Sequence, residues 1–148
     1  MKNRFRVWDK RERELKNVTN MSFCSCHGIL GGVTMLNESD YFFSNDENFV
    51  LEQCTGLKDK NGKLIYEGDI LSFTVFDYND YDTQYTGVVV YHGSRYTIWN
   101  NPDSEYYGSD GGFDLDWVIG QDCEIEIIGN IHENPELLKV EGWDASNI

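Results

Sequence analysis

The chain has 148 residues, 40% of them hydrophobic, a formal net charge of −14 and four cysteines, which suits one domain that buries roughly 70% of its unfolded surface. No apolar run approaches the ~20 residues of a membrane-spanning helix, no secretory signal opens the sequence, and the cysteines lack the spacing of a disulfide framework. These features exclude a membrane-embedded or disulfide-stapled class and predict a soluble cytoplasmic protein with free thiols.

The first 70 residues predict added hairpins and an irregular segment. Residues 5–8 alternate as a strand should, and residues 15–18 can pair back with them across a charged turn. A short helix over 10–17 is the alternative. Residues 19–48 are rich in Asn, Ser, Gly, Asp and Glu, so we expect irregular connections there with one or two short strands.

A clearer strand pattern begins at residue 49. Phe49–Cys54 alternates as a strand, and a turn over Lys58–Lys63 follows it. Asn61-Gly62 lies in this turn and is a strong hairpin signal, because both residues tolerate a positive φ. Leu64–Tyr66 predicts the returning strand.

The C-terminal half predicts a compact β body over residues 70–140. Its strongest strand carries Gly-Val-Val-Val-Tyr, since β-branched residues suit a pleated surface. Asn134-Pro135-Glu136 combines a good N-cap, a proline for the first helical position and an acid at the positive helix end, which predicts a short helix over 135–140. Strands are expected at 70–76, 85–92, 95–100, 113–119 and 124–129.

This spacing of strands is typical of a small SH3-like barrel or a meander. We therefore predict a mainly β fold, in the sense of β-rich α+β. It has N-terminal hairpins, the barrel or meander in the C-terminal half, and one short C-terminal helix. The expected organisation is a single domain over 1–148, with an N-terminal part (1–70) and a barrel-like core (70–140).

Three phrases carry a resemblance to a known family: Phe5-Arg6-Val7-Trp8-Asp9-Lys10, the run Thr55–Ile70 and the run Ile127–Leu138. In order and spacing they resemble the YopX family of prophage- and phage-encoded proteins. The resemblance implies a mainly β fold and a bacterial cytoplasm or phage-infected cell. It implies no catalytic residue, cofactor or substrate.

Two groups of side chains raise the question of a metal. Cys24–His27 offers two thiols and an imidazole, which Cys54 or Cys123 would complete to four ligands. Its cysteine spacing is not that of structural zinc sites, so ordinary thiols are favoured. Asp77–Asp82 and Asp110–Asp116 offer oxygens to calcium but lack the EF-hand order, so solvated loops are favoured. We expect no metal and no cofactor.

Catalytic signals are also weak. His92 and His132 have no serine or cysteine motif beside them, and no Gly-rich phosphate loop is present. Carboxylate pairs are too common in so acidic a chain to indicate a hydrolase. Asp69 is better explained by turn geometry than by catalysis. We expect that the protein is not an enzyme.

The charge is unevenly distributed. Residues 1–16 carry seven basic and three acidic side chains and thus net +4, which leaves −18 for the rest of the chain. Residues 77–126 hold eleven acids and one base, Arg95. Because phosphate contacts depend on Lys and Arg, direct nucleic-acid binding by this body is disfavoured.

The aromatic residues of the acidic loops suggest partner contacts. Four loop tyrosines are poor core candidates, and protein interfaces favour Tyr and Trp. They are Tyr78, Tyr81, Tyr106 and Tyr107. The leading hypothesis is a noncatalytic phage accessory protein that binds protein or forms homo-oligomers. The alternative is an acidic nucleic-acid mimic that inhibits a host DNA-binding enzyme.

Overall fold

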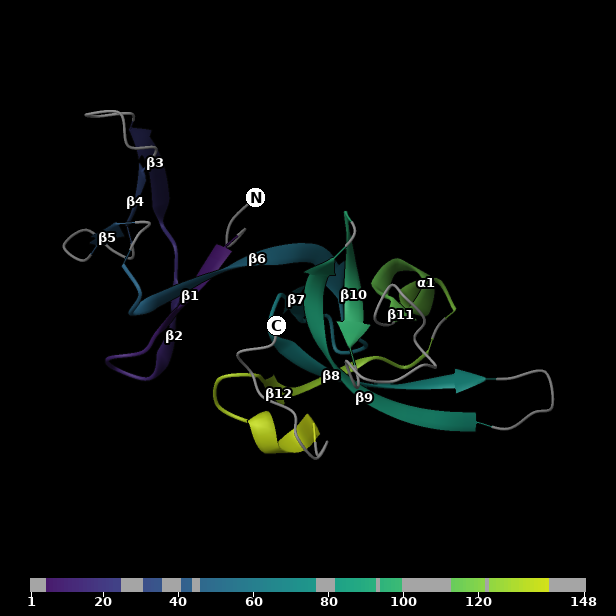
Figure 1. Cartoon of the computed structure of the whole chain (residues 1–148). Coiled ribbons are helices and arrows are strands. Elements are labelled where there is room, and N and C mark those ends of the chain that lie inside the picture. Colours follow the sequence, from purple (N-terminus) through teal and green to yellow (C-terminus); the bar gives the residue numbers. More distant parts are fainter. Residues whose placement is uncertain are drawn as a thin grey trace. The chain divides into compact units, whose positions relative to one another are not determined.

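Figure 1 shows the fold of the chain in a computed structural model. It describes residues 5–24, 31–35, 41–43, 46–76, 82–92, 94–99, 113–121 and 123–138. The predicted mainly β fold is confirmed, since most of these residues lie in antiparallel strands. The chain contains two compact units, Met1–Cys54 and Thr55–Ile148. The expectation of a single domain over 1–148 stays a prediction.

The first unit opens with a β-hairpin. Strand β1 (Phe5–Asp9) pairs with β2 (Glu14–Asn17) and, on its other side, with the start of β6 (Phe49–Lys58). The turn between β1 and β2 closes with a hydrogen bond from Arg13 N to Asp9 O of 2.7 Å. The hairpin prediction is therefore confirmed, and the helical alternative over 10–17 is wrong.

A second sheet of this unit lies within the segment predicted to be mostly irregular. It contains β3 (Asn20–Cys24), β4 (Gly31–Met35) and β5 (Tyr41–Phe43) in that order, all antiparallel. Three strands thus stand where one or two were expected. These strands are only three to five residues long, which is too short for an alternating pattern to define them.

Strand β6 continues past the predicted end at residue 54 to Lys58. Its last part belongs to the second unit, where β7 (Leu64–Tyr66) is its neighbour in the sheet. The connecting turn closes with hydrogen bonds from Asp59 N to Lys63 O and from Gly62 N to Asp59 O. Gly62 alone of the Asn-Gly pair takes a positive φ, of 80°.

The second unit is built on a five-stranded antiparallel sheet in the order β11-β10-β9-β8-β12. Because β8 to β11 are neighbours in chain order, they form the predicted meander, and β12 is added beside β8 with a bulge between Ile127 and Gly129. The strands are β8 (Asp69–Phe76), β9 (Asp82–His92), β10 (Arg95–Trp99), β11 (Phe113–Asp114) and β12 (Glu126–Asn130).

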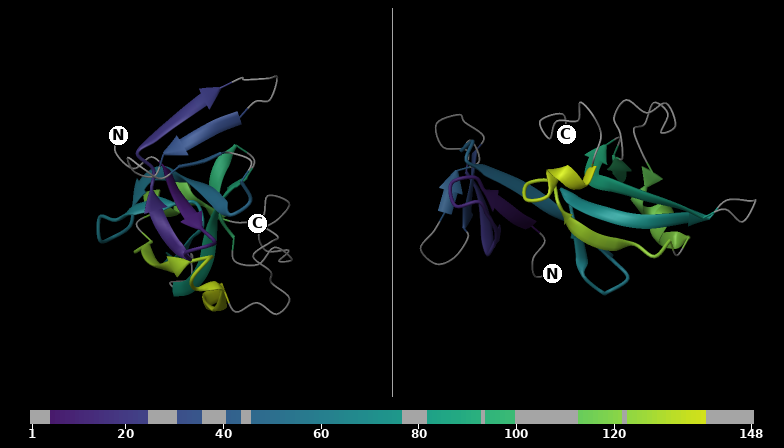
Figure 2. Two further views of the ribbon diagram at one scale, coloured as in Figure 1. Left: turned by 90° about the vertical axis from the view of Figure 1, so that its left-hand side faces the viewer. Right: turned by 90° about the horizontal axis from the view of Figure 1, so that it is seen from below.

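The strands of this sheet are drawn in Figure 2. Their side chains alternate between two apolar clusters, one on each face of the sheet. Leu71 and Phe73 of β8 pack on one face with Leu115 and Val118 of helix α1 (Leu115–Gly120). Ile70 packs on the other face, with the cluster that includes Leu138 of the 3-10 helix η3 (Pro135–Leu138). The two short helices therefore cover opposite faces of one sheet.

The prediction of a strand over 113–119 is wrong beyond residue 114. Asp114 caps a helix instead, because its carboxylate accepts a hydrogen bond from Trp117 N at 3.3 Å. Leu115 and Val118 are three residues apart and are both fully buried, which suits a helical turn better than a strand. The helix predicted over 135–140 is a single 3-10 turn, and residues 139–140 lie outside the described part of the chain.

Candidate protein-binding surface

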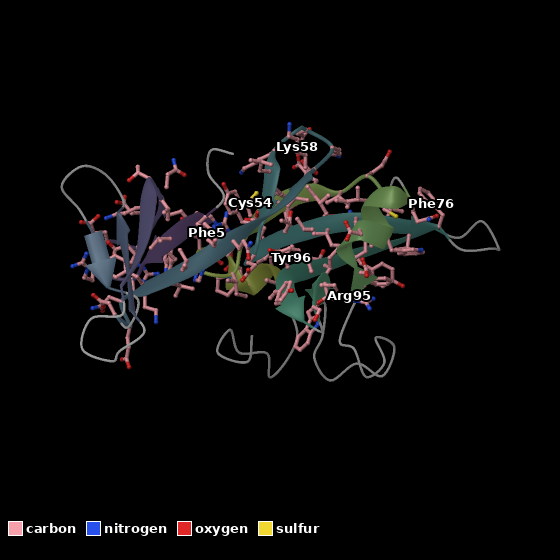
Figure 3. The ribbon with its side chains drawn as sticks, turned by 90° about the horizontal axis from the view of Figure 1, so that it is seen from above. Phe5, Cys54, Lys58, Phe76, Arg95 and Tyr96 are labelled. Atoms are coloured by element: carbon pink, nitrogen blue, oxygen red, sulfur yellow. The ribbon has the colours of Figure 1, made fainter. Side chains whose placement is uncertain are left out.

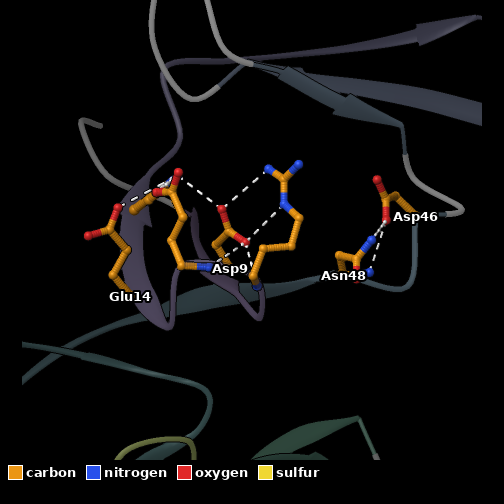
Figure 4. Close-up of polar contacts among 7 residues, drawn as sticks. Asp9, Glu14, Asp46 and Asn48 are labelled. Atoms are coloured by element: carbon orange, nitrogen blue, oxygen red, sulfur yellow. Dashed lines mark hydrogen bonds and ion pairs between the residues drawn. The ribbon is translucent and has the colours of Figure 1, made fainter.

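The acid of the first phrase organises the first hairpin (Figure 4). Asp9 has no exposed surface. Its carboxylate accepts hydrogen bonds from Arg11 N at 2.9 Å and from Lys16 Nζ at 3.0 Å. Burial by itself raises the pKa of Asp9, but the bonds from Lys16 and Arg11 outweigh it and lower the pKa from 3.8 to about 2. Asp9 is thus a structural ion-pair residue.

The second phrase owes its pattern to two further buried acids. Asp59 accepts backbone hydrogen bonds from Asn61 N and Lys63 N at 2.9 Å, and from Ile127 N at 3.2 Å. It therefore builds its own turn and ties that turn to the start of β12. Asp69 accepts a hydrogen bond from Tyr66 N at 2.8 Å, which supports the turn geometry expected for it.

In the third phrase, two asparagines shape the turn after β12. Asn130 Oδ1 accepts hydrogen bonds from His132 N at 3.0 Å and Glu133 N at 2.9 Å. Asn134 Oδ1 accepts one from Asn130 N at 3.3 Å. At Gly129 a Cβ atom would come within 2.6 Å of Asn134 Oδ1. The motif therefore needs a glycine there so that Asn134 can approach the backbone.

The metal candidates can be placed only in part. Cys54 and Cys123 are buried, whereas residues 25–30, with Cys26 and His27, lie outside the described residues. Most of the two acidic clusters lies outside them as well. Within the part of the chain that the structure describes, no group of three or more His, Cys, Asp and Glu side chains is arranged to hold a metal.

The four predicted partner-binding tyrosines, Tyr78, Tyr81, Tyr106 and Tyr107, all lie outside the described residues. The second unit exposes other aromatic side chains. Phe76 is 54% exposed, Tyr91 58% and Trp117 47%. Figure 3 shows Phe76 at the end of β8. The sequence pattern did not single these residues out, because each lies in a predicted strand where an inward orientation was equally possible.

Trp117 has the best-supported position of the three. Its ring stacks on Phe113, with 6.4 Å between centroids and 10° between planes. Phe113 in turn packs edge-on against Phe73 and Tyr85, at 5.4 and 5.0 Å. Because Phe73 is only 1% exposed, this chain of rings connects an exposed indole to the core. Asp114, a good helix N-cap residue, was the sequence signal that would have indicated the helix and thus the exposed position of Trp117.

Two acidic residues lie close to Trp117 in the sequence, at the start of the short helix α1. Asp114 lies three residues before Trp117, on the same side of the helix, and Asp116 is exposed. Arg95 Nη1 pairs with Asp114 Oδ2 at 3.1 Å, and Figure 3 shows Arg95 on β10. The single base of residues 77–126 is therefore already matched with a carboxylate, and the outward face of α1 combines an aromatic ring with acids.

Together the fold and the motif geometry define a class: an antiparallel β protein whose recurrent acids and asparagines hold turns in place. No helix among the described residues is long and apolar enough to cross a membrane. The family model described as "YopX protein" matches residues 4–139. The chain belongs to the YopX family.

A solved structure has a similar fold over nearly the whole chain. The chain is similar to the crystal structure of protein EF1440 from Enterococcus faecalis, with 26% sequence identity and a TM-score of 0.50. The alignment covers 91% of this chain and 96% of that one. No curated protein matches the chain.

Proposed function

We propose that the chain is a noncatalytic phage accessory protein that acts in the bacterial cytoplasm by binding protein, a second copy of itself included. The observation that carries this proposal is the exposure of three large aromatic side chains on the second unit: Phe76, Tyr91 and Trp117. Tyr and Trp are enriched at protein interfaces because they bury a large area with few rotatable bonds.

Two of these side chains are held in place by contacts with a second aromatic ring. Tyr91 packs edge-on against Tyr96 at 5.1 Å, and Trp117 stacks on Phe113. An exposed ring that is already ordered loses little side-chain entropy when a partner covers it. Such preordered rings suit recognition better than mobile ones do.

The placement of the motif acids supports a noncatalytic role. Asp9, Asp59 and Asp69 are buried, and their carboxylates accept backbone N–H groups or bind basic side chains. A carboxylate engaged in this way is not positioned to exchange a proton with a substrate. The acids of the family phrases therefore stabilise the backbone of turns and do not form a reaction centre.

The same burial weakens the alternative of a nucleic-acid mimic. A mimic needs an array of surface carboxylates about as dense as phosphates. Among the residues whose burial the structure describes, four acids are buried instead: Asp9, Glu52, Asp59 and Asp69. They contribute to the net charge but add nothing to such an array, so protein binding is the better-supported function.

The test is a mass measurement by size exclusion with light scattering, followed by affinity capture from a bacterial lysate. We expect an oligomer or a specifically captured protein. A triple variant, Phe76→Ser, Tyr91→Ser and Trp117→Ser, should lose the self-association or the captured protein. The matched control changes the exposed polar residues Gln53, Lys58 and Glu136 to serine. A strict monomer that captures nothing overturns the proposal.

A further inference from the structure

We infer that the outward face of α1 binds a cationic segment of a partner protein, with an arginine or lysine stacked on Trp117 and paired with Asp116. This inference rests on the proposed function and deepens it, because it names the chemistry of the partner. It concerns a single surface of the second unit.

The aromatic part of the surface is rigid and accessible. The Trp117 ring is 47% exposed and lies nearly parallel to Phe113 beneath it. The Phe113 ring therefore holds the indole in place, while about half of the Trp117 surface is available to a ligand. Indole is the aromatic ring that attracts cations best.

The electrostatic part favours a cation over any other ligand. Residues 77–126 carry eleven acids and one base, and that base, Arg95, is paired with Asp114. Asp116 directly precedes Trp117 in the chain and is exposed. An anionic partner would be repelled here, and a purely apolar partner would leave the carboxylate desolvated at a cost. A basic segment can form a cation–π contact with the ring and an ion pair with the carboxylate at the same time.

In the first unit, an arginine of this chain is already bound by an aromatic ring and a carboxylate. The Arg11 guanidinium lies 4.7 Å from the centroid of the Phe49 ring. The same guanidinium donates to both carboxylate oxygens of Asp9, at 3.4 Å each. An aromatic ring and a neighbouring acid thus hold an arginine in this protein, and α1 presents the ring and the acid on its surface.

The test is an NMR titration of the full-length protein with an acetylated, amidated peptide of alternating arginine and glycine. The indole N–H signal of Trp117, assigned with Trp117→Phe, reports binding. A peptide with citrulline in place of arginine keeps the shape and removes the charge. We expect saturable shifts at Trp117 with the arginine peptide and none with the citrulline peptide.

Two matched pairs of variants test the site against general charge attraction. Trp117→Leu should weaken binding about threefold or more through loss of the cation–π contact. Leu51→Ala, at an exposed apolar side chain on β6, should leave it unchanged. Asp116→Asn should weaken binding about twofold. Glu136→Gln removes the same charge on η3, across the sheet, and should have no effect.

Equal weakening by Asp116→Asn and Glu136→Gln, or equal binding of the citrulline peptide, overturns the inference. The inference is also overturned if the protein self-associates through Trp117 but does not bind the arginine peptide. The surface then binds a second copy of the chain instead of a cationic segment. If the protein captures a partner through residues other than Trp117, the inference fails and the proposed function stands. If it captures nothing and stays monomeric, both fail.

Discussion

Side chains of Asp and Asn at turns recur in all three family phrases. Asp9, Asp59 and Asn130 each accept a hydrogen bond from the backbone N–H two residues further on. This local bond is the reason Asp and Asn favour turns. The phrases are thus explained by backbone geometry, and Asp59 in addition accepts a hydrogen bond from Ile127 N, far along the chain.

Asp59 offers the sharpest test of this role. Asp59→Ala leaves three backbone N–H groups without their acceptor, one of them 68 residues away in sequence. We expect a loss of about 2–4 kcal/mol in the free energy of unfolding, measured by urea titration. Glu126→Gln removes an exposed ion pair with Lys60 of 3.6 Å and should cost less than about 0.5 kcal/mol. Equal effects would contradict the role assigned to Asp59.

The ion pair of Asp9 predicts a pH dependence. Because its pKa falls from 3.8 to about 2 on folding, the deprotonated form is favoured in the folded state. Its contribution, about 2 kcal/mol, is complete above pH ~4 and is lost as the pH falls toward 2. Hydrogen bonding to Glu12 and Asp9 raises the pKa of Lys16, so its share is lost only at strongly alkaline pH.

The measurement follows the Trp8 indole signal in urea titrations at pH 7, 4 and 2.5. The wild type should lose stability in the first unit between pH 4 and 2.5, and Asp9→Asn should show a smaller change over the same interval. Parallel losses in the two proteins would show that other carboxylates control the acid transition.

At the level of single elements, β9 needs a glycine because of close packing. A Cβ atom at Gly87 would lie 2.7 Å from both Ile98 Cγ2 and Trp99 O of β10. The second of these atoms belongs to the backbone and cannot rotate away. The Gly-Val-Val-Val run therefore combines three strong strand formers with one position where the neighbouring strand comes too close for any side chain.

Gly87→Ala should therefore destabilise the second unit by about 1–3 kcal/mol through overpacking. The matched control is Gly120→Ala at the end of α1, where a Cβ atom meets nothing within 4 Å and alanine is the better helix former. It should be neutral or slightly stabilising. Thermal unfolding followed by circular dichroism compares the two variants, and the opposite ranking would contradict the packing argument.

The segment 113–119 shows why local pattern alone misassigned an element. Phe113, Leu115 and Trp117 alternate as in a strand, whereas Leu115 and Val118 fit one side of a helix. Both periods are present over so short a run. The cap at Asp114 and the core contacts of Leu115 and Val118 select the helix, and this selection leaves Trp117 in solvent.

In the molecule as a whole, the two units differ in buried apolar content. The second unit has apolar clusters of nine and five buried residues, and the described part of the first has a cluster of two. Hydrophobic stabilisation grows with buried apolar area. We therefore expect the first unit to unfold at lower denaturant than the second.

The indole signals of Trp8 in the first unit and Trp99 in the second report the two transitions separately. In a urea titration the Trp8 signal should disappear first. Coincident midpoints, together with a single m-value that fits the whole chain, would show that the chain unfolds as one cooperative body.

From the residues alone one can predict the mainly β fold, the first hairpin, the Asn61-Gly62 turn and the meander of the second unit. These features depend on alternation and on bonds between residues close in the chain. Three other features become visible only in the packed protein: Asp59 binds the start of β12, Gly87 faces a neighbouring backbone, and α1 replaces a strand. Each of these depends on which distant segments pack together, and burial of apolar surface settles that over the whole unit.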